Sequence, residues 1–135
     1  MRHRLIAFSL LGVLLAVTGC DDGPKVVKVS GVATHQGAPV PNLRINFQPD
    51  KGRPSWGDTD QNGRFTLEYD AKNKGALLGR HTVSAAFEAG DPDVEMSGKI
   101  PRAVRVITDK YGDTMNSPLK IEITGPIDNL EVKFD

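Results

Sequence analysis

The most regular cluster of residues that could do chemistry is the D-T-D-Q-N-G stretch at residues 58–63. Its D-x-D-x-N-G spacing matches the first half of an EF-hand calcium loop, which needs a bidentate glutamate at its twelfth position. Counted from the first aspartate, that position holds Tyr69, and a glutamate falls one place early. The spacing therefore favours a hairpin turn, in which Asp60 or Asn62 hydrogen-bonds nearby backbone and Gly63 supplies the left-handed residue.

Metal-binding and nucleophilic residues lack the spacing that their chemistry requires. His35 and His81 stand far apart, and no H-x-H or H-E-x-x-H pattern occurs. We therefore expect solvated or hydrogen-bonded surface histidines and no metal site. The chain has no G-x-S-x-G elbow and no nucleophile presented beside a histidine. We expect a protein that is not an enzyme and needs no cofactor.

Two further features could support binding rather than catalysis. Trp56 is the single tryptophan and lies in a segment rich in proline and glycine. An exposed indole could stack on a sugar or a partner, although such a tryptophan more often caps one end of a small core. Acidic residues followed by basic ones could form a cation or partner site, although such segments are usually solvated loops. These charged residues are Glu88, Asp91, Asp93, Glu95, Lys99, Arg102 and Arg105.

The single cysteine, Cys20, ends a segment typical of export. A basic head at residues 2–4 precedes an apolar run over residues 5–17, shorter than the roughly 20 residues of a membrane-spanning helix. The V-T-G-C sequence at residues 17–20 resembles the bacterial lipobox, and this resemblance implies cleavage after Gly19 and a diacylglyceryl group on Cys20. We expect a signal peptide at 1–19 and a lipidated tether at 20–25. An ordinary secretory signal or a short anchor, with an incidental cysteine, is the alternative.

Length, charge and composition narrow the class of protein. The 135 residues suit one domain, and glycine and proline, at 14 and 9 residues, favour a loop-rich β protein. Seventeen basic and seventeen acidic residues cancel, which gives no electrostatic case for nucleic acid. One cysteine excludes an intrachain disulfide framework and a multi-cysteine zinc site.

Short alternating segments predict an all-β fold over residues 26–135. No sustained helical period is evident after residue 19, and about seven strands indicate an antiparallel β-sandwich. Residues 49–57 are expected to form a loop, and residues 88–103 and 107–118 long connections. The expected strands cover 26–34, 43–47, 65–69, 82–87, 119–123 and 130–134, with 104–106 as a weaker candidate. The expected inward residues are Val27, Val29, Leu43, Ile45, Phe47, Phe65, Leu67, Tyr69, Val83, Ala85, Phe87, Leu119, Ile121, Ile123, Leu130, Val132 and Phe134.

Four motifs follow one another along this region. They are V-S-G-V followed by G-A-P-V-P (29–41), T-D-Q-N-G-R-F (59–65), G-R-H-T-V (79–83), and K-Y followed by S-P-L (110–119). In this order they resemble the short bacterial lipoproteins with a carboxypeptidase regulatory-like domain. The resemblance implies a Greek-key sandwich of the transthyretin-like (prealbumin-like) type, which serves as an accessory or interaction domain. A hydrolase of this fold ends in Y-R-G-S, whereas this chain ends in V-K-F-D.

These observations lead to two functional hypotheses. The first is a non-enzymatic lipoprotein, exported to the bacterial cell envelope and held at a membrane through lipid on Cys20, that contacts an envelope protein. The second is a carbohydrate- or cell-wall-binding module that uses Trp56 and the long loops. Trp56 and Tyr111 are the candidate contact residues. The sequence leaves open which membrane leaflet the protein faces.

Overall fold

The computed structural model of the protein describes Gly19 and residues 23–135, and these residues form ten strands and two helices. Cys20 and the rest of the expected signal peptide and early tether lie outside the described residues. The strands are β1 (Val26–Val27), β2 (Val29–His35), β3 (Ala38–Pro39), β4 (Leu43–Pro49), β5 (Ser55–Asp58), β6 (Arg64–Thr66), β7 (Ala76–Leu77), β8 (Gly79–Phe87), β9 (Leu119–Ile123) and β10 (Ile127–Lys133). The helices are α1 (Pro92–Ser97) and α2 (Arg102–Tyr111).

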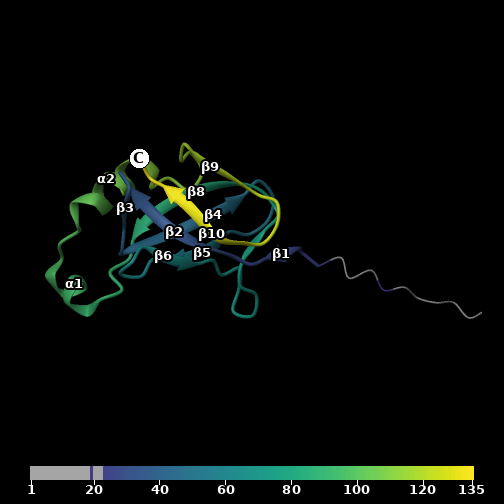
Figure 1. The fold of residues 1–135 in the computed structure, drawn as a ribbon, viewed down its shortest axis with the longest axis horizontal. Helices are drawn as coiled ribbons and strands as arrows, with labels where there is room; N and C mark the ends of the chain where they lie inside the picture. The colour runs from purple at the N-terminus through teal and green to yellow at the C-terminus, as the bar shows by residue number, and fades with distance from the viewer. Residues whose placement is uncertain (1–18, 20–22) are drawn as a thin grey trace, which may run out of the picture.

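Two four-stranded sheets and one small ribbon make up the β structure (Figure 1). One sheet has the order β5-β4-β8-β9, and all its pairs are antiparallel. In the other sheet β2 pairs with β10, β3 and β6, while β1 and β7 form the ribbon. This mostly antiparallel, sandwich-like architecture agrees with the expected fold class. The β2–β10 pair is parallel, and β10 follows β9, which belongs to the opposite sheet.

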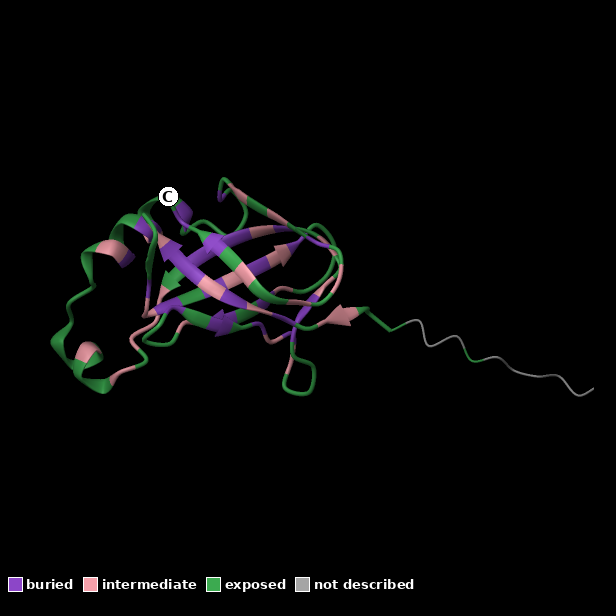
Figure 2. Ribbon diagram, in the orientation of Figure 1, coloured by how far each residue is buried: buried purple, intermediate pink, exposed green. Residues whose placement is uncertain are grey.

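The core between the two sheets contains the residues that strand alternation selects. Phe47 and Phe134 are fully buried, and side chains from both sheets belong to one cluster. Every expected inward residue is buried or is half-buried and packed on this core. The half-buried ones are Val27, Phe87, Leu119, Ile121 and Leu130. Figure 2 shows this pattern as alternating buried and exposed bands along the longer strands.

The expected strand at 104–106 is wrong, because these residues lie in helix α2. Val104, Ile107 and Tyr111 are its buried residues, and their spacing of three and four places them on one face of a helix. This face packs against β8 and completes the core beside Phe134. Three residues that alternate apolar, polar and apolar fit a strand as well as a helix. A window of that length therefore cannot assign the segment correctly. Helix α1 likewise lies inside a stretch that was expected to be a connection.

The expected loop at 49–57 is also wrong in part, because it contains the start of β5. Ser55 and Gly57 are buried in this strand, whereas Trp56 and Asp58 face outward. Gly57 is required for packing, since a Cβ atom there would lie 2.7 Å from the main-chain oxygen of Thr66. In the sequence, a glycine at this position suggests the end of a strand. In the structure, Gly57 instead allows β5 to approach β6 closely.

The chain enters the sandwich at one end and places its helices at the other. Gly23 to Lys25 are exposed and lead into β1, at the right of Figure 1. The β2–β3 hairpin, α1 and α2 lie at the left, at the far end of the domain. None of the helices in the described part of the chain is both long and apolar enough to span a membrane.

Candidate functional site

The turn at residues 59–63 joins β5 to β6 and is built around Asp60. The Asp60 Oδ1 atom accepts hydrogen bonds from the backbone N–H groups of Asn62, at 2.8 Å, and Arg64, at 2.9 Å. Gly63 has a φ of 70°, and its N–H donates to the Asp60 carbonyl. This is the arrangement expected of a hairpin turn. In it, one oxygen of the Asp60 carboxylate is hydrogen-bonded to two backbone N–H groups.

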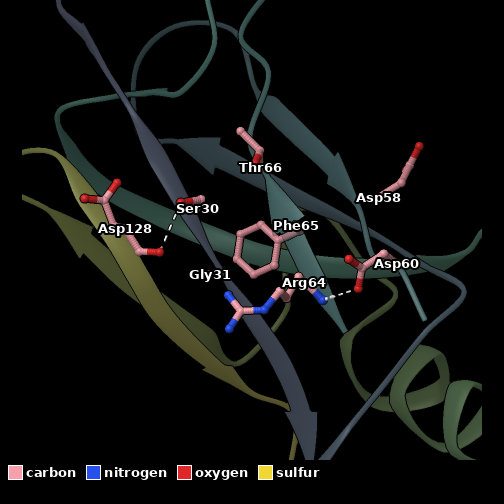
Figure 3. A pocket seen from close by; sticks show the side chains of 8 residues that line it. All are labelled: Ser30, Gly31, Asp58, Asp60, Arg64, Phe65, Thr66 and Asp128. Carbon is pink, nitrogen blue, oxygen red and sulfur yellow. Dashed lines mark hydrogen bonds between the residues drawn. The ribbon is translucent and has the colours of Figure 1, made fainter. Parts of the chain in front are cut away.

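A polar hollow of about 260 Å³ lies beside this turn, between β2, β6 and the start of β10 (Figure 3). Asp128 lies on one side of Arg64, and Asp58 and Asp60 lie on the other. Ser30, which also lines the hollow, donates a hydrogen bond to the Asp128 carbonyl at 3.1 Å. Despite these carboxylates, the described residues include no group of three or more histidine, cysteine or acidic side chains that could hold a metal ion.

Trp56 lies on the outer face of the sheet and does not cap the core. The expectation that it packs at one end of the core is therefore wrong. Its side chain is 38% exposed, and the Arg44 guanidinium lies 4.9 Å from the ring centroid. Arg44 is fixed there by two hydrogen bonds to Asp58, of 2.7 and 2.9 Å, and by Glu88 at 3.4 Å. The hydrogen bonds to Asp58, aided by the charges of Asp58 and Glu88, raise the pKa of Arg44.

A second hollow, of about 440 Å³, is lined by Trp56, Gly57, Asp58, Thr66 and Glu68. It shares Asp58 and Thr66 with the polar hollow, so the two adjoin. We call the two hollows together the Trp56 groove. It combines one aromatic platform with carboxylate and hydroxyl groups, which can hydrogen-bond the hydroxyls of a sugar while its ring stacks on the indole.

The two histidines occupy different environments, and the expectation of surface positions is wrong for His81. His81 is fully buried, packs against Phe47 with ring centroids 5.7 Å apart, and places Nε2 2.8 Å from the Leu77 carbonyl. Its Nδ1 has no hydrogen-bond partner among the residues that the structure describes. His35 is half-buried at the end of β2, and its Nδ1 contacts the Phe134 carbonyl. The two side chains therefore belong to separate parts of the sandwich.

Tyr111 is 6% exposed, so the structure places it in the core and away from any surface that a ligand could reach. Its ring packs edge-on against Phe134, with centroids 5.2 Å apart, and its hydroxyl donates to the main-chain oxygen of Asp135. These contacts fasten the last turn of α2 to the end of the chain that follows β10. Tyr111 thus holds the helix in place.

A second groove, which the sequence did not reveal, lies between the β2–β3 hairpin and α2. One part has a volume of about 310 Å³ and an apolar lining that includes Val40, Pro41, Pro101 and Val104. An adjoining part of about 540 Å³ continues along Arg102, Ala103 and Val106, and both parts share His35, Gln36 and Ala103. We call this surface the hairpin–helix groove. The prolines that cluster in the two segments are the sequence signal for such a rigid, apolar lining.

The expected chemistry at Cys20 falls outside the described residues, so the structure contributes only the two grooves to the candidate site. The Trp56 groove has an aromatic and polar lining, whereas the hairpin–helix groove has a mainly apolar one. In comparisons with known protein families, with curated proteins and with solved structures, nothing matched this chain.

Proposed function

We propose that this chain is a non-enzymatic lipoprotein of the bacterial cell envelope, exported by residues 1–19 and held at a membrane by lipid on Cys20. The proposal rests on the V-T-G-C sequence at the end of the apolar run. Two or more acyl chains anchor a protein stably, at about 0.8 kcal/mol for each buried CH₂ group. Residues 20–25 then span at most roughly 20 Å between the membrane and β1.

The domain after the tether is proposed to be a Greek-key, transthyretin-like sandwich of the carboxypeptidase regulatory-like family. The positions of the four motifs in the fold support this. The first motif forms β2 and the β2–β3 hairpin, the second forms the turn between β5 and β6, and the third begins β8. The last motif covers the end of α2 and the start of β9. Each motif therefore marks a boundary where the chain turns or changes element.

The domain is proposed to work by contacting another envelope protein. The observation that carries this is the opposition of the two ends: the tether enters at β1, while α1, α2 and the hairpin–helix groove lie at the far end (Figure 1). A chain anchored through the tether would point this end away from the membrane. Exposed apolar side chains gather there, among them Met96 at 86% exposure and Val106 at 46%.

Membrane fractionation with cross-linking in intact cells tests this proposal. The native chain should sediment with membranes and be captured repeatedly with one envelope protein, whereas Cys20→Ala should lose both properties. Cys20→Ser serves as a matched control and should behave like the alanine variant, because a hydroxyl cannot form the thioether. Membrane retention of both variants would contradict acylation, and retention of the native chain without any captured protein would contradict the contact function.

A second candidate function is carbohydrate or cell-wall binding, favoured by the half-exposed Trp56 beside Asp58, Thr66 and Glu68. A sugar ring stacked on the free side of the indole could donate its hydroxyls to these oxygens. Sedimentation with purified cell wall and titration with soluble glycans test it. Binding should be lost in Trp56→Ala and partly kept in Trp56→Phe, which retains an aromatic face. No binding by the native chain, or equal binding by Trp56→Ala, would contradict it.

A further inference from the structure

Helix α1 projects from the body of the domain without packing on it. None of its six residues is buried, and Figure 2 shows it coloured as exposed or intermediate throughout. The helix is bounded by two glycines with positive φ, Gly90 at 60° and Gly98 at 63°, and Asp91 caps its first turn. The turn is therefore defined by local backbone geometry while its side chains remain available.

The exposed face of α1 is both apolar and acidic. Met96 is 86% exposed, and Asp93 lies one turn before it on the same face. Glu95 is its neighbour in sequence and is also exposed. In the described part of the chain, neither carboxylate forms an ion pair. The helix thus presents one flexible apolar side chain flanked by negative charges.

The hairpin–helix groove has the complementary character. Its smaller part, of about 310 Å³, has a mainly apolar lining, and Arg102 lines its larger part. Arg102 is exposed, and together with Lys99 and Arg105 it makes no ion pair with the described residues. The Asp135 carboxylate also lies near the groove, where it accepts a hydrogen bond from the Gln36 backbone N–H. The groove therefore offers an apolar recess beside an exposed arginine that forms no ion pair with the described residues.

We propose that α1 docks in the hairpin–helix groove of a second copy of this chain, so that the envelope protein contacted at this end is another copy of the same protein. Met96 enters the apolar recess, and Asp93, one turn before it on the same face, lies against Arg102 of the other copy. Opposite charges on the two surfaces fix the register, and the unbranched methionine adapts to the recess. Because α1 and the groove lie at the same end of the domain, a two-fold axis can form both contacts at once. The inference does not depend on the lipid anchor, because it uses only residues of the folded domain.

Cysteine cross-linking between two differently tagged full-length copies tests this contact. One copy carries Met96→Cys and the other Ala103→Cys, and both are expressed in the same cells before mild oxidation. We expect a mixed disulfide dimer that contains both tags and is absent when either copy lacks its substitution. Chains with only Cys20 provide the background. No mixed dimer, or a 96–103 disulfide formed within one chain carrying both substitutions while the mixed pair gives none, would overturn the proposal.

A matched control separates docking from random collision. Met115 is 69% exposed and belongs to neither α1 nor the groove, so Met115→Cys paired with Ala103→Cys should give only background. Charge reversal provides an independent test. Arg102→Glu should reduce the mixed dimer by about 1.5- to 5-fold, the range of an exposed ion pair, and Asp93→Arg in the other copy should restore it. Equal product at Met115, or no effect of either reversal, would overturn the proposal.

Discussion

Helices α1 and α2 follow one another in the chain but have opposite relations to the fold. Helix α2 buries Val104, Ile107 and Tyr111 in the core, whereas α1 buries no side chain. Both are shorter than the roughly 12 to 15 residues at which an isolated helix becomes marginally stable. Helix α2 therefore depends on its packing, and α1 depends on its caps and on whatever it contacts.

This difference teaches that helix formation alone does not show what a segment is for. The apolar face of α2 closes the core beside Phe134, so its role is structural. The apolar residue of α1 faces outward, so it contributes little to the stability of one copy. The following predictions test this contrast, beginning with the largest expected effect.

Ile107→Ala should lower the free energy of unfolding by about 2–5 kcal/mol. The Ile107 side chain of α2 is fully buried, so its truncation leaves a cavity in the core. Urea unfolding of the full chain measures this loss. The neighbouring Val106 is 46% exposed, and Val106→Ala should stay within about 0.5 kcal/mol of the native protein. Equal losses in the two variants would mean that α2 does not pack through the face described above.

Tyr111→Phe should lower the free energy of unfolding by about 0.5–1.5 kcal/mol. The substitution removes the hydroxyl donor to the main-chain oxygen of Asp135 and keeps the ring against Phe134. The same urea measurement detects the change, and Tyr111→Ala should cost more because it removes the ring as well. An unchanged Tyr111→Phe protein would show that the ring alone holds the last turn of α2.

Asp113 lies in the loop after α2 and should make stability depend on pH. Hydrogen bonds from the Asn116 side chain, and then from the backbone N–H groups of Met115 and Asn116, lower the pKa of Asp113. Because the folded pKa lies below the unfolded value, the stabilisation is complete above the ordinary aspartate pKa of about 3.9 and is lost as pH falls through the folded pKa.

Unfolding of the native chain and of Asp113→Ala, compared across pH, measures this effect. The native chain should be the more stable at neutral pH, and the difference should vanish in acid. Asp70 has a pKa lowered in the same way, chiefly by the Asn73 side chain, but it is present in both proteins, so its contribution cancels. A difference that stays constant down to strongly acidic pH would contradict the account.

Met96→Ala should have the smallest effect, within about 0.5 kcal/mol for the dilute protein, because the side chain is 86% exposed. Thermal or urea unfolding at low protein concentration measures it. A loss of more than about 1 kcal/mol in the dilute protein would show that α1 packs on its own domain, which would remove the contrast with α2.

Local patterns predicted the parts of the fold that depend on neighbours in sequence. Strict alternation at 43–47 and 119–123 identified β4 and β9, and the Asp60 turn needs only its own residues. The same alternation places His81 on the inward side of β8 with Val83, so its burial was predictable had strand position been weighed above polarity. The parallel β2–β10 pair was not predictable, because its strands lie almost 100 residues apart.

The candidate site was harder to predict because its residues come from distant segments. Residues 104–106 look like a strand in isolation, and only a longer window that includes Ile107 and Tyr111 shows the helical spacing. The hairpin–helix groove combines residues near 35–41 with residues 101–106, and no local pattern connects these two segments. Trp56 was identified from its residue type, but its stacking on Arg44 depends on the pairing of β4 with β5.

Hydrogen exchange of the full chain tests most directly the claim that α2 maintains the fold while α1 makes contacts. The protein is compared in native membranes and after detergent extraction and dilution. The α2 amides should be protected in both states, whereas residues 92–97 should exchange rapidly when dilute and become protected in the membrane. Equal exchange of residues 92–97 in the two states, or exchange of α2 as fast as that of α1, would contradict the account.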